Sequence, residues 1–180
     1  MPGPILHILI PLIVIGLIRD YCIKNKKKFS LHYVLIAAIA GVLPDLDIAL
    51  FWFMNLFVKE TAWYAVHRTF THSIFFVGSF LTIGIATLKV NIRKLRKHKL
   101  NLGMIFIMIA VGFSSHLLLD WLLQSTIALL WPLTTQRFGL NLLGFLPENF
   151  QSNMLAALEG LLLILWLIYL ELKHKISDFI

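Results

Sequence analysis

The sequence predicts an all-α integral membrane protein: a helical bundle of about five spans, with one short re-entrant or interfacial helix, in a single domain over residues 1–180. Hydrophobic residues make up 59% of the chain and charged residues only 14%, which leaves too few polar side chains to cover a water-soluble domain of this size. The apolar residues also fall into separate runs divided by basic clusters, the pattern of a multi-span helical membrane protein.

Five apolar runs are expected to cross the bilayer, at residues 5–18, 31–43, 74–88, 102–123 and 154–170. Pro44 is expected to end the second run, because the residue before a proline avoids helical geometry. The apolar run at residues 48–58 is too short to span and is predicted to be re-entrant or interfacial. Cys22 is the single cysteine, which excludes an intramolecular disulfide and a cysteine-based zinc motif.

The basic clusters predict the orientation in the membrane. Lysines and arginines collect at residues 24–28, 89–99 and 173–175, and all others except Lys59, Arg68 and Arg137 lie in or beside these segments. Because an excess of lysine and arginine marks cytoplasmic loops, the N-terminus is expected outside and the C-terminus in the cytoplasm of an inner membrane. The net charge of +7 is then a topology signal, and no nucleic acid is expected as partner.

This orientation gathers seven ionisable residues at the outer ends of the predicted helices: His7, Asp45, Asp47, His67, His72, His116 and Asp120. His116 and Asp120 are four residues apart, so they share one helix face and can bind one ion. An ionisable side chain at membrane depth is costly and marks a functional site by default. Because the seven come from different runs, they predict a site built between helices of the bundle.

The residue types predict a metal site that supports hydrolysis. Imidazole and carboxylate ligands favour zinc, with manganese or magnesium as alternatives, and seven candidates allow one or two ions. A bound ion activates water, and Asp45 or Asp47 is expected to orient that water or take its proton. Arg68 is expected to hold a phosphate, with Arg137 as a second clamp. A site of this kind at headgroup depth predicts a phosphoester of a membrane lipid or polyprenyl substrate.

Other interpretations of the same residues stay open. Asp47 can cap the helix that follows it, His7 can be an interfacial residue, and the two arginines can contact lipid headgroups. A divalent-cation or proton transport protein also uses intramembrane histidine and aspartate, and a scaffold can bind metal for stability alone. The inner halves of the runs are apolar, which favours an enzyme with an outer opening over a conduit.

Four motifs in order, LPDLD, HRTFTHS, SSHLLLDWL and LLWPLTTQRFG, carry a family resemblance. Together they resemble the YdjM/YbcI-type family of membrane-bound metal-dependent hydrolases, over about residues 5–140. The resemblance implies that the seven histidines and aspartates are the polar signature of the family, and that Trp131, Pro132 and Arg137 form its WP-x-x-x-x-R element. More distantly, the closing H-x-x-x-D is similar to zinc-dependent phospholipase C and related nucleases. The chain lacks the additional motifs of those three-metal enzymes, so three ions are not expected.

Overall fold

The computed structural model describes residues 3–26, 29–57, 67–123 and 126–176, and these ranges are mainly helical. Within them, β pairing is limited to an isolated bridge between Ile127 and Phe138. The predicted all-α fold class is therefore confirmed. Part of the first basic cluster (residues 27–28), Lys59 and the end of the apolar run at 48–58 lie outside the described residues.

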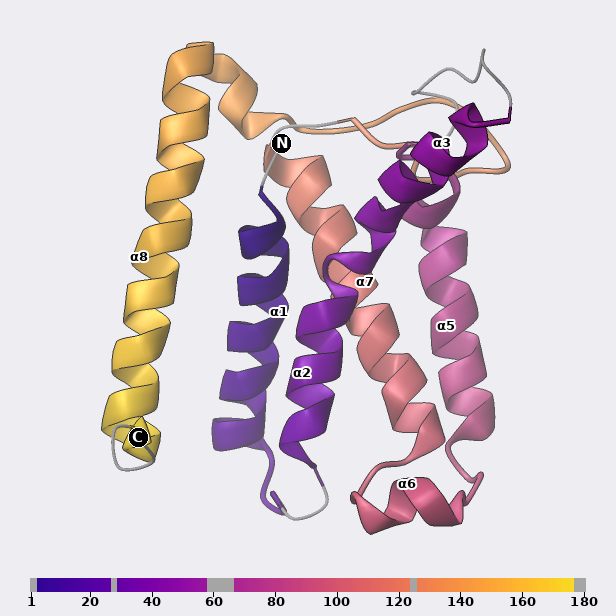
Figure 1. Cartoon of the computed structure of the whole chain (residues 1–180), viewed down its shortest axis with the longest axis vertical. Coiled ribbons are helices and arrows are strands. Elements are labelled where there is room, and N and C mark those ends of the chain that lie inside the picture. Colours follow the sequence, from indigo (N-terminus) through magenta and orange to yellow (C-terminus); the bar gives the residue numbers. More distant parts are fainter. Residues whose placement is uncertain (1–2, 27–28, 58–66, 124–125, 177–180) are drawn as a thin grey trace.

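Five helices run alternately down and up in Figure 1: α1 (Pro4–Leu17), α2 (Leu31–Ala40), α5 (Ile74–Thr87), α7 (Leu102–Leu123) and α8 (Glu148–His174). Shorter elements connect them: a π-helical turn (Ile18–Cys22) that extends α1, α3 (Asp47–Asn55), α6 (Arg93–Lys97), and 3₁₀ turns at Leu43–Leu46, Phe70–His72 and Leu142–Phe145. The N-terminal end of α1 and the C-terminal end of α8 lie at opposite ends of the bundle (Figure 1).

The predicted interruption at Pro44 is confirmed. α2 ends at Ala40, Pro44 lies in the 3₁₀ turn that follows, and α3 then leaves at an angle of 45°. Ser73 begins α5, since its hydroxyl accepts a hydrogen bond from the backbone N–H of Phe76 at 3.2 Å, as a helix-capping serine does. The acidic pair Asp45 and Asp47 is thus placed in a bend rather than along a continuous helix.

The number of spans is smaller than predicted. Among the described residues, three helices are long and apolar enough to cross a membrane: Pro4–Cys22, Leu102–Leu123 and Asn149–His174. The bent pair Leu31–Ala40 and Leu43–Asn55 makes a fourth if it is one broken span. α5 has 14 residues, so it is about 21 Å long at 1.5 Å per residue, against about 30 Å of hydrocarbon. The expected five spans are therefore three to four.

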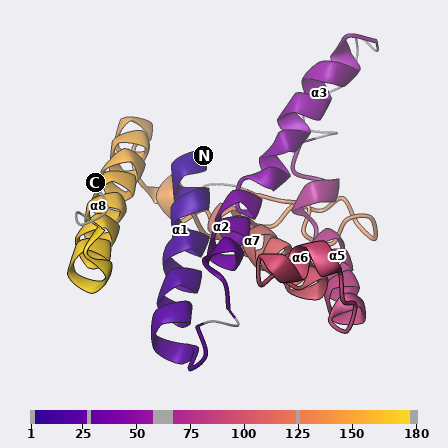
Figure 2. The ribbon, with the colours of Figure 1, turned by 60° about the horizontal axis from the view of Figure 1, so that its bottom comes forward.

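The interior of the bundle is apolar at the end that carries the basic segments. Ile15 of α1, Tyr33, Val34 and Ala37 of α2, and Met108 of α7 form one buried cluster. On the other side of α7, Phe76 and Phe80 of α5 pack on Phe113, at ring-centroid distances of 5.3 and 5.1 Å. α8 stands beside α1 (Figures 1 and 2), where Trp166 packs against Gly16.

α1, α2 and α7 approach one another most closely where the histidines and aspartates lie. Pro11 has no N–H to donate to the carbonyl of His7, four residues earlier in α1. A Cβ added at Gly41 would collide with that carbonyl, and one added at Gly112 would lie 2.6 Å from Ala40 Cβ. The glycines therefore let the three backbones meet, as small residues do between membrane helices.

Candidate metal centre

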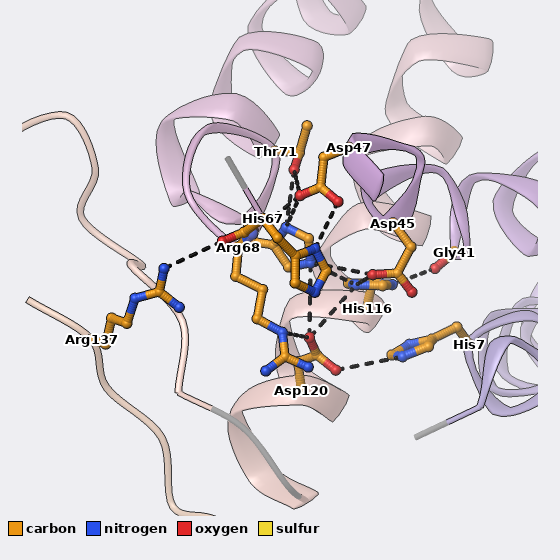
Figure 3. A network of polar contacts seen from close by, with 11 residues as sticks. His7, Gly41, Asp45, Asp47, His67, Arg68, Thr71, His116, Asp120 and Arg137 are labelled. Atoms are coloured by element: carbon orange, nitrogen blue, oxygen red, sulfur yellow. Dashed lines mark hydrogen bonds and ion pairs between the residues drawn. The ribbon is translucent and has the colours of Figure 1, made fainter. Parts of the chain in front are cut away.

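The buried polar residues of the described chain coincide almost completely with the predicted ligands. They are His7, Asp47, His67, His72, Ser73, His116 and Asp120. All except Ser73 belong to the predicted set, and the seventh member, the Asp45 side chain, is 20% exposed. The side chains come from α1, the bend from α2 into α3, the start of α3, the segment before α5, and α7. The members that Figure 3 labels point toward one another. The structure thus brings together all seven residues that the orientation argument placed at one end.

Three donor atoms are spaced as ligands of one ion. His72 Nε2 and His116 Nε2 are 3.1 Å apart, and Asp45 Oδ1 is 3.6 Å from the first and 3.5 Å from the second. A triangle with these sides has a point about 2.0 Å from all three atoms, which matches zinc–nitrogen and zinc–oxygen bond lengths of about 2.0–2.2 Å. Asp120 Oδ2 lies 3.8 Å from both nitrogens, close enough to complete a four-atom set.

Gly41 fixes the protonation pattern of His116. The ring Nδ1 of His116 is 2.7 Å from the Gly41 carbonyl oxygen. A carbonyl only accepts hydrogen bonds, so Nδ1 carries a proton, and in the tautomer that binds metal the lone pair is then on Nε2. That lone pair faces the centre between His72 and Asp45. The backbone of α2 therefore prepares His116 for ligation in the way that outer-sphere carbonyls orient metal-binding histidines.

Asp47 holds the segment that carries two of the histidines. Its Oδ1 accepts a hydrogen bond from His67 Nδ1 at 2.8 Å. Its Oδ2 accepts from the Arg68 backbone N–H at 3.1 Å and from the Thr71 hydroxyl at 3.0 Å, and lies 3.4 Å from His72 Nδ1. Asp47 opens α3, whose N-cap is Leu46 and has no side-chain cap. The capping interpretation of Asp47 is therefore wrong, and its contacts orient the two imidazoles.

His7 belongs to the cluster and not to the membrane interface. Its ring is 1% exposed and stacks on His116, with the centroids 3.9 Å apart and 24° between the planes. His7 Nε2 lies 3.5 Å from Asp120 Oδ1, while its Nδ1 is buried with no hydrogen-bond partner among the described residues. An unsatisfied buried nitrogen of this kind is explained by an ion or water.

The two arginines differ in position. Arg68 has a left-handed backbone with φ of 61°, a conformation found at strained functional sites, and its Nε lies 3.5 Å from Asp120 Oδ2. Its Nη2 is buried without an acceptor among the described residues. Arg137 is at the rim (Figure 3), where its Nη2 donates to the His67 carbonyl at 3.3 Å. Arg68 therefore reaches the cluster, and Arg137 supports the segment that carries it.

The electrostatics of the centre favour a cation. The carboxylates of Asp45, Asp47 and Asp120 gather among the histidines, and Arg68 Nε lies 3.5 Å from Asp120 Oδ2. Burial alone would lower the pKa of His72, but hydrogen bonds and charges from Asp45 and Asp47 outweigh burial and raise this pKa above 6.5. The carboxylates around His72 therefore favour a positive charge at this position.

The donor set fits one ion or two. Three groups have ligand atoms within 4.8 Å of one another: Asp45–His72–His116, His7–His116–Asp120 and Asp45–Asp47–His67. The first two share His116, whose Nδ1 is used by Gly41, so they are alternatives for one ion. The first and third share Asp45, so a second ion would be held by Asp45, Asp47 and His67.

Comparison with known proteins identifies the family of this chain. The sequence matches the family described as YdjM inner membrane protein over residues 1–176. The chain belongs to this family. The match confirms the YdjM family that the four motifs indicated and supports an integral location in the inner membrane; metal-dependent hydrolysis is not part of what this match shows. No curated protein and no solved structure matches the chain.

The structure adds residues that the sequence did not single out. Thr71 and Gly41 act on the histidines through a hydroxyl and a backbone carbonyl, which leave no pattern in the sequence. Glu159 is different, because an acidic residue inside an apolar run is a signal by itself. Its Oε1 accepts a hydrogen bond from the Leu6 backbone N–H at 3.3 Å, so α8 supplies an acceptor to the first turn of the helix that carries His7.

Proposed function

We propose that the protein is a membrane-embedded metal-dependent hydrolase that cleaves a phosphoester of a lipid or polyprenyl substrate at the extracytoplasmic leaflet through a metal-activated water. The observation that carries this proposal is the triangle of Asp45, His72 and His116 donor atoms, with the buried guanidinium of Arg68 beside it. A cation site next to an arginine with unsatisfied donors is suited to a phosphate group, which brings both negative charge and acceptor oxygens.

The contacts of each residue indicate its role in the proposed reaction. Asp45, His72 and His116 hold the ion, with His7 and Asp120 beside them. The bound ion supplies Lewis acidity and lowers the pKa of water toward about 7. Arg68 holds the phosphate oxygens. Asp47, with its oxygens already engaged by the segment at residues 67–72, orients the imidazoles.

Proton transfer is assigned to Asp45. Its side chain is 20% exposed, whereas those of Asp47 and Asp120 are 2% and 1% exposed. A general base must reach the water whose proton it takes, and Asp45 is the carboxylate of the cluster with access to the site mouth. Asp45 is therefore assigned both roles, ligand and base. The sequence alone does not decide between Asp45 and Asp47 for the role of base.

The position of the centre supports a substrate that resides in the membrane. The basic α6, the loop after α1 and the C-terminal end of α8 lie at one end of the bundle, and the outer parts of α1 and α7 lie at the other (Figure 1). If the basic end is cytoplasmic, the centre is in the opposite leaflet. Substrates with a phosphate at this depth and a hydrocarbon tail are phospholipids and polyprenyl phosphates.

A transport function is disfavoured by the packing beyond the centre. A conduit needs polar residues that continue toward the other end of the bundle. Among the described residues, the cluster next to the centre consists of Ile15, Tyr33, Val34, Ala37 and Met108, all buried. The Tyr33 hydroxyl accepts from the Asn101 backbone at the basic end and does not link to the centre. In the part of the chain that the structure describes, this packing offers no polar path from the centre toward the basic end.

The proposal is tested with purified protein in detergent. Metal is removed, zinc, manganese or magnesium is returned, and phosphate release is measured from lipid and polyprenyl phosphates. Release by wild type is expected to stop with chelator and to fall at least about 100-fold in His116→Ala, with His98→Ala, a histidine outside the centre, as the matched control. Activity that survives metal removal, or equal activity of His116→Ala and wild type, contradicts the proposal. Metal flux in liposomes that Asp120→Asn abolishes would instead establish transport.

A further inference from the structure

A cavity lies at the basic end of the bundle, away from the metal centre. It has a volume of about 450 Å³, is partly open, and is lined by residues of α1, α2 and α8 and their extensions. Arg19, Asp20 and His174 line its polar end, and Leu35 and Trp166 are among the residues of its apolar walls. Figures 1 and 2 show α1 between α8 and α2, and the lining of the cavity comes from all three helices.

The mouth of the cavity carries an excess of positive charge. Asp20 is 4% exposed and is surrounded by donors: His174 Nε2 at 2.6 Å, the Tyr169 hydroxyl at 2.9 Å, Arg19 Nη1 at 3.2 Å and Lys26 Nζ at 3.5 Å. Arg19 lines the cavity, and Lys26 reaches Asp20 from beside it, so two positive charges lie around the carboxylate of Asp20. Both cations keep access to solvent, since their side chains are 20% and 44% exposed.

The size of the cavity restricts what can fill it. A further helix of only ten residues, about 10 Å wide and 15 Å long, occupies about 1,200 Å³, which is more than twice the cavity volume. A hydrocarbon chain is thin enough to lie between α2 and α8. Walls such as Leu12, Val34 and Leu170 offer it an apolar surface.

We propose that this cavity binds an anionic phospholipid of the leaflet at the basic end, with an acyl chain between α2 and α8 and the phosphate at Arg19 and Lys26. Arginine and lysine at the mouth of a pocket between membrane helices form the kind of site that recognises anionic headgroups, and arginine pairs with phosphate oxygens through charge-assisted hydrogen bonds. A zwitterionic lipid is disfavoured because its own cation would meet the same positive charge. The bound lipid joins α8 to the rest of the bundle.

The test uses the full chain, purified in detergent and stripped of lipid. Phosphatidylglycerol and phosphatidylcholine with the same acyl chains are added separately, and bound lipid is counted by native mass spectrometry while the melting temperature is recorded. Phosphatidylglycerol is expected to bind and to raise the melting temperature more than phosphatidylcholine. The double variant R19Q/K26Q is expected to lower phosphatidylglycerol affinity at least about tenfold. The matched control is K94Q/K97Q in α6, which removes the same charge elsewhere and is expected to bind as wild type does.

A second variant keeps the test decisive if R19Q/K26Q disturbs the network around Asp20. Leu35→Trp enlarges a wall residue that is 47% exposed and leaves the charged mouth intact, so it is expected to fold and to lose bound phosphatidylglycerol. Equal binding of the two lipids, an equal loss in K94Q/K97Q, or full binding by Leu35→Trp overturns the proposal. A dimer that Leu35→Trp dissociates would assign the surface to a second copy of the chain. None of these results depends on the metal centre.

Discussion

Replacing Asp47 by asparagine tests the role of the carboxylate that the structure places behind the histidines. In the wild type, Oδ1 accepts from His67 Nδ1, and Oδ2 accepts from the Arg68 N–H and the Thr71 hydroxyl. Asparagine keeps one acceptor oxygen and turns the other position into an NH₂ donor. If the oxygen of the asparagine keeps the hydrogen bonds from Arg68 and Thr71, the asparagine NH₂ faces His67 Nδ1. His67 Nδ1 then has to accept a hydrogen bond instead of donating one. The proton of His67 moves to Nε2, and His67 loses the lone pair that it would offer to an ion held by the group Asp45–Asp47–His67.

The expected loss of zinc affinity in Asp47→Asn is worked out in two independent ways. Loss of one hydrogen bond to a charged group costs about 1.5–3 kcal/mol. Removal of an outer-sphere partner of a metal-binding histidine lowers metal affinity about 10- to 100-fold, which is about 1.4–2.7 kcal/mol at 25 °C. The two ranges overlap, so Asp47→Asn is expected to weaken zinc binding by about one to two orders of magnitude. The dissociation constant is measured by competition with a chromophoric chelator in detergent.

Asp20→Asn is the matched control for this measurement. Asp20 is also a buried aspartate with a histidine partner, His174, but it lies at the opposite end of the bundle. Asp20→Asn is expected to lower the melting temperature and to leave zinc affinity within about threefold of wild type. Unchanged zinc affinity in Asp47→Asn, or an equal loss in Asp20→Asn, would refute the assignment of Asp47 to the metal centre.

Three further predictions concern the surroundings of the centre. Glu159→Ala removes one of the two acceptors of the Leu6 N–H, which also donates to the Gly3 carbonyl at 3.1 Å. It is expected to cost up to about 1 kcal/mol and to weaken zinc binding, whereas Glu159→Gln keeps the side-chain acceptor and restores both; equal effects of the two variants in thermal melts would contradict this. Gly112→Ala places a Cβ 2.6 Å from Ala40 Cβ and is expected to destabilise by about 1–3 kcal/mol, whereas Gly160→Ala, with nothing within 4 Å, is expected to be neutral. The pKa of His72 is raised in the folded protein, so protonation of His72 stabilises the metal-free protein only below that pKa. The melting temperature of the metal-free protein is therefore expected to fall as pH rises from about 6 to 8, while zinc affinity increases because the histidine ligands lose their protons. Zinc affinity that is independent of pH would exclude histidine ligands.

The elements that the sequence predicts correctly are those determined by residues next to one another in the chain. The apolar run at 102–123 is the helix Leu102–Leu123, and Pro44 interrupts the chain as expected because its effect acts on its immediate neighbours. The number of spans is predicted less well, because composition does not show that α2 ends at Ala40 and that the chain continues at an angle into α3. Helix length depends on packing and capping as well as on hydropathy, and α8 extends well beyond its predicted core of 154–170.

The membership of the site was predictable, but the division of roles was not. Seven residues could be placed together because orientation and the cost of buried charge act on each one separately. The difference between Asp45 and Asp47 depends on which donors the segment at 67–72 brings to each carboxylate. Likewise, Arg137 is directed to the His67 carbonyl by a long connection whose path no local pattern indicates. Such roles require the three-dimensional arrangement.

The most direct test of the metal centre is the position of a bound ion. Crystals of the purified protein, grown with zinc and measured above and below the zinc absorption edge, give an anomalous difference map. The structure predicts a peak about 2.0–2.2 Å from Asp45 Oδ1, His72 Nε2 and His116 Nε2, the usual zinc–ligand distance, and any second peak beside Asp45 and His67. An anomalous map with no peak among these side chains, in protein that binds zinc elsewhere, would contradict the account.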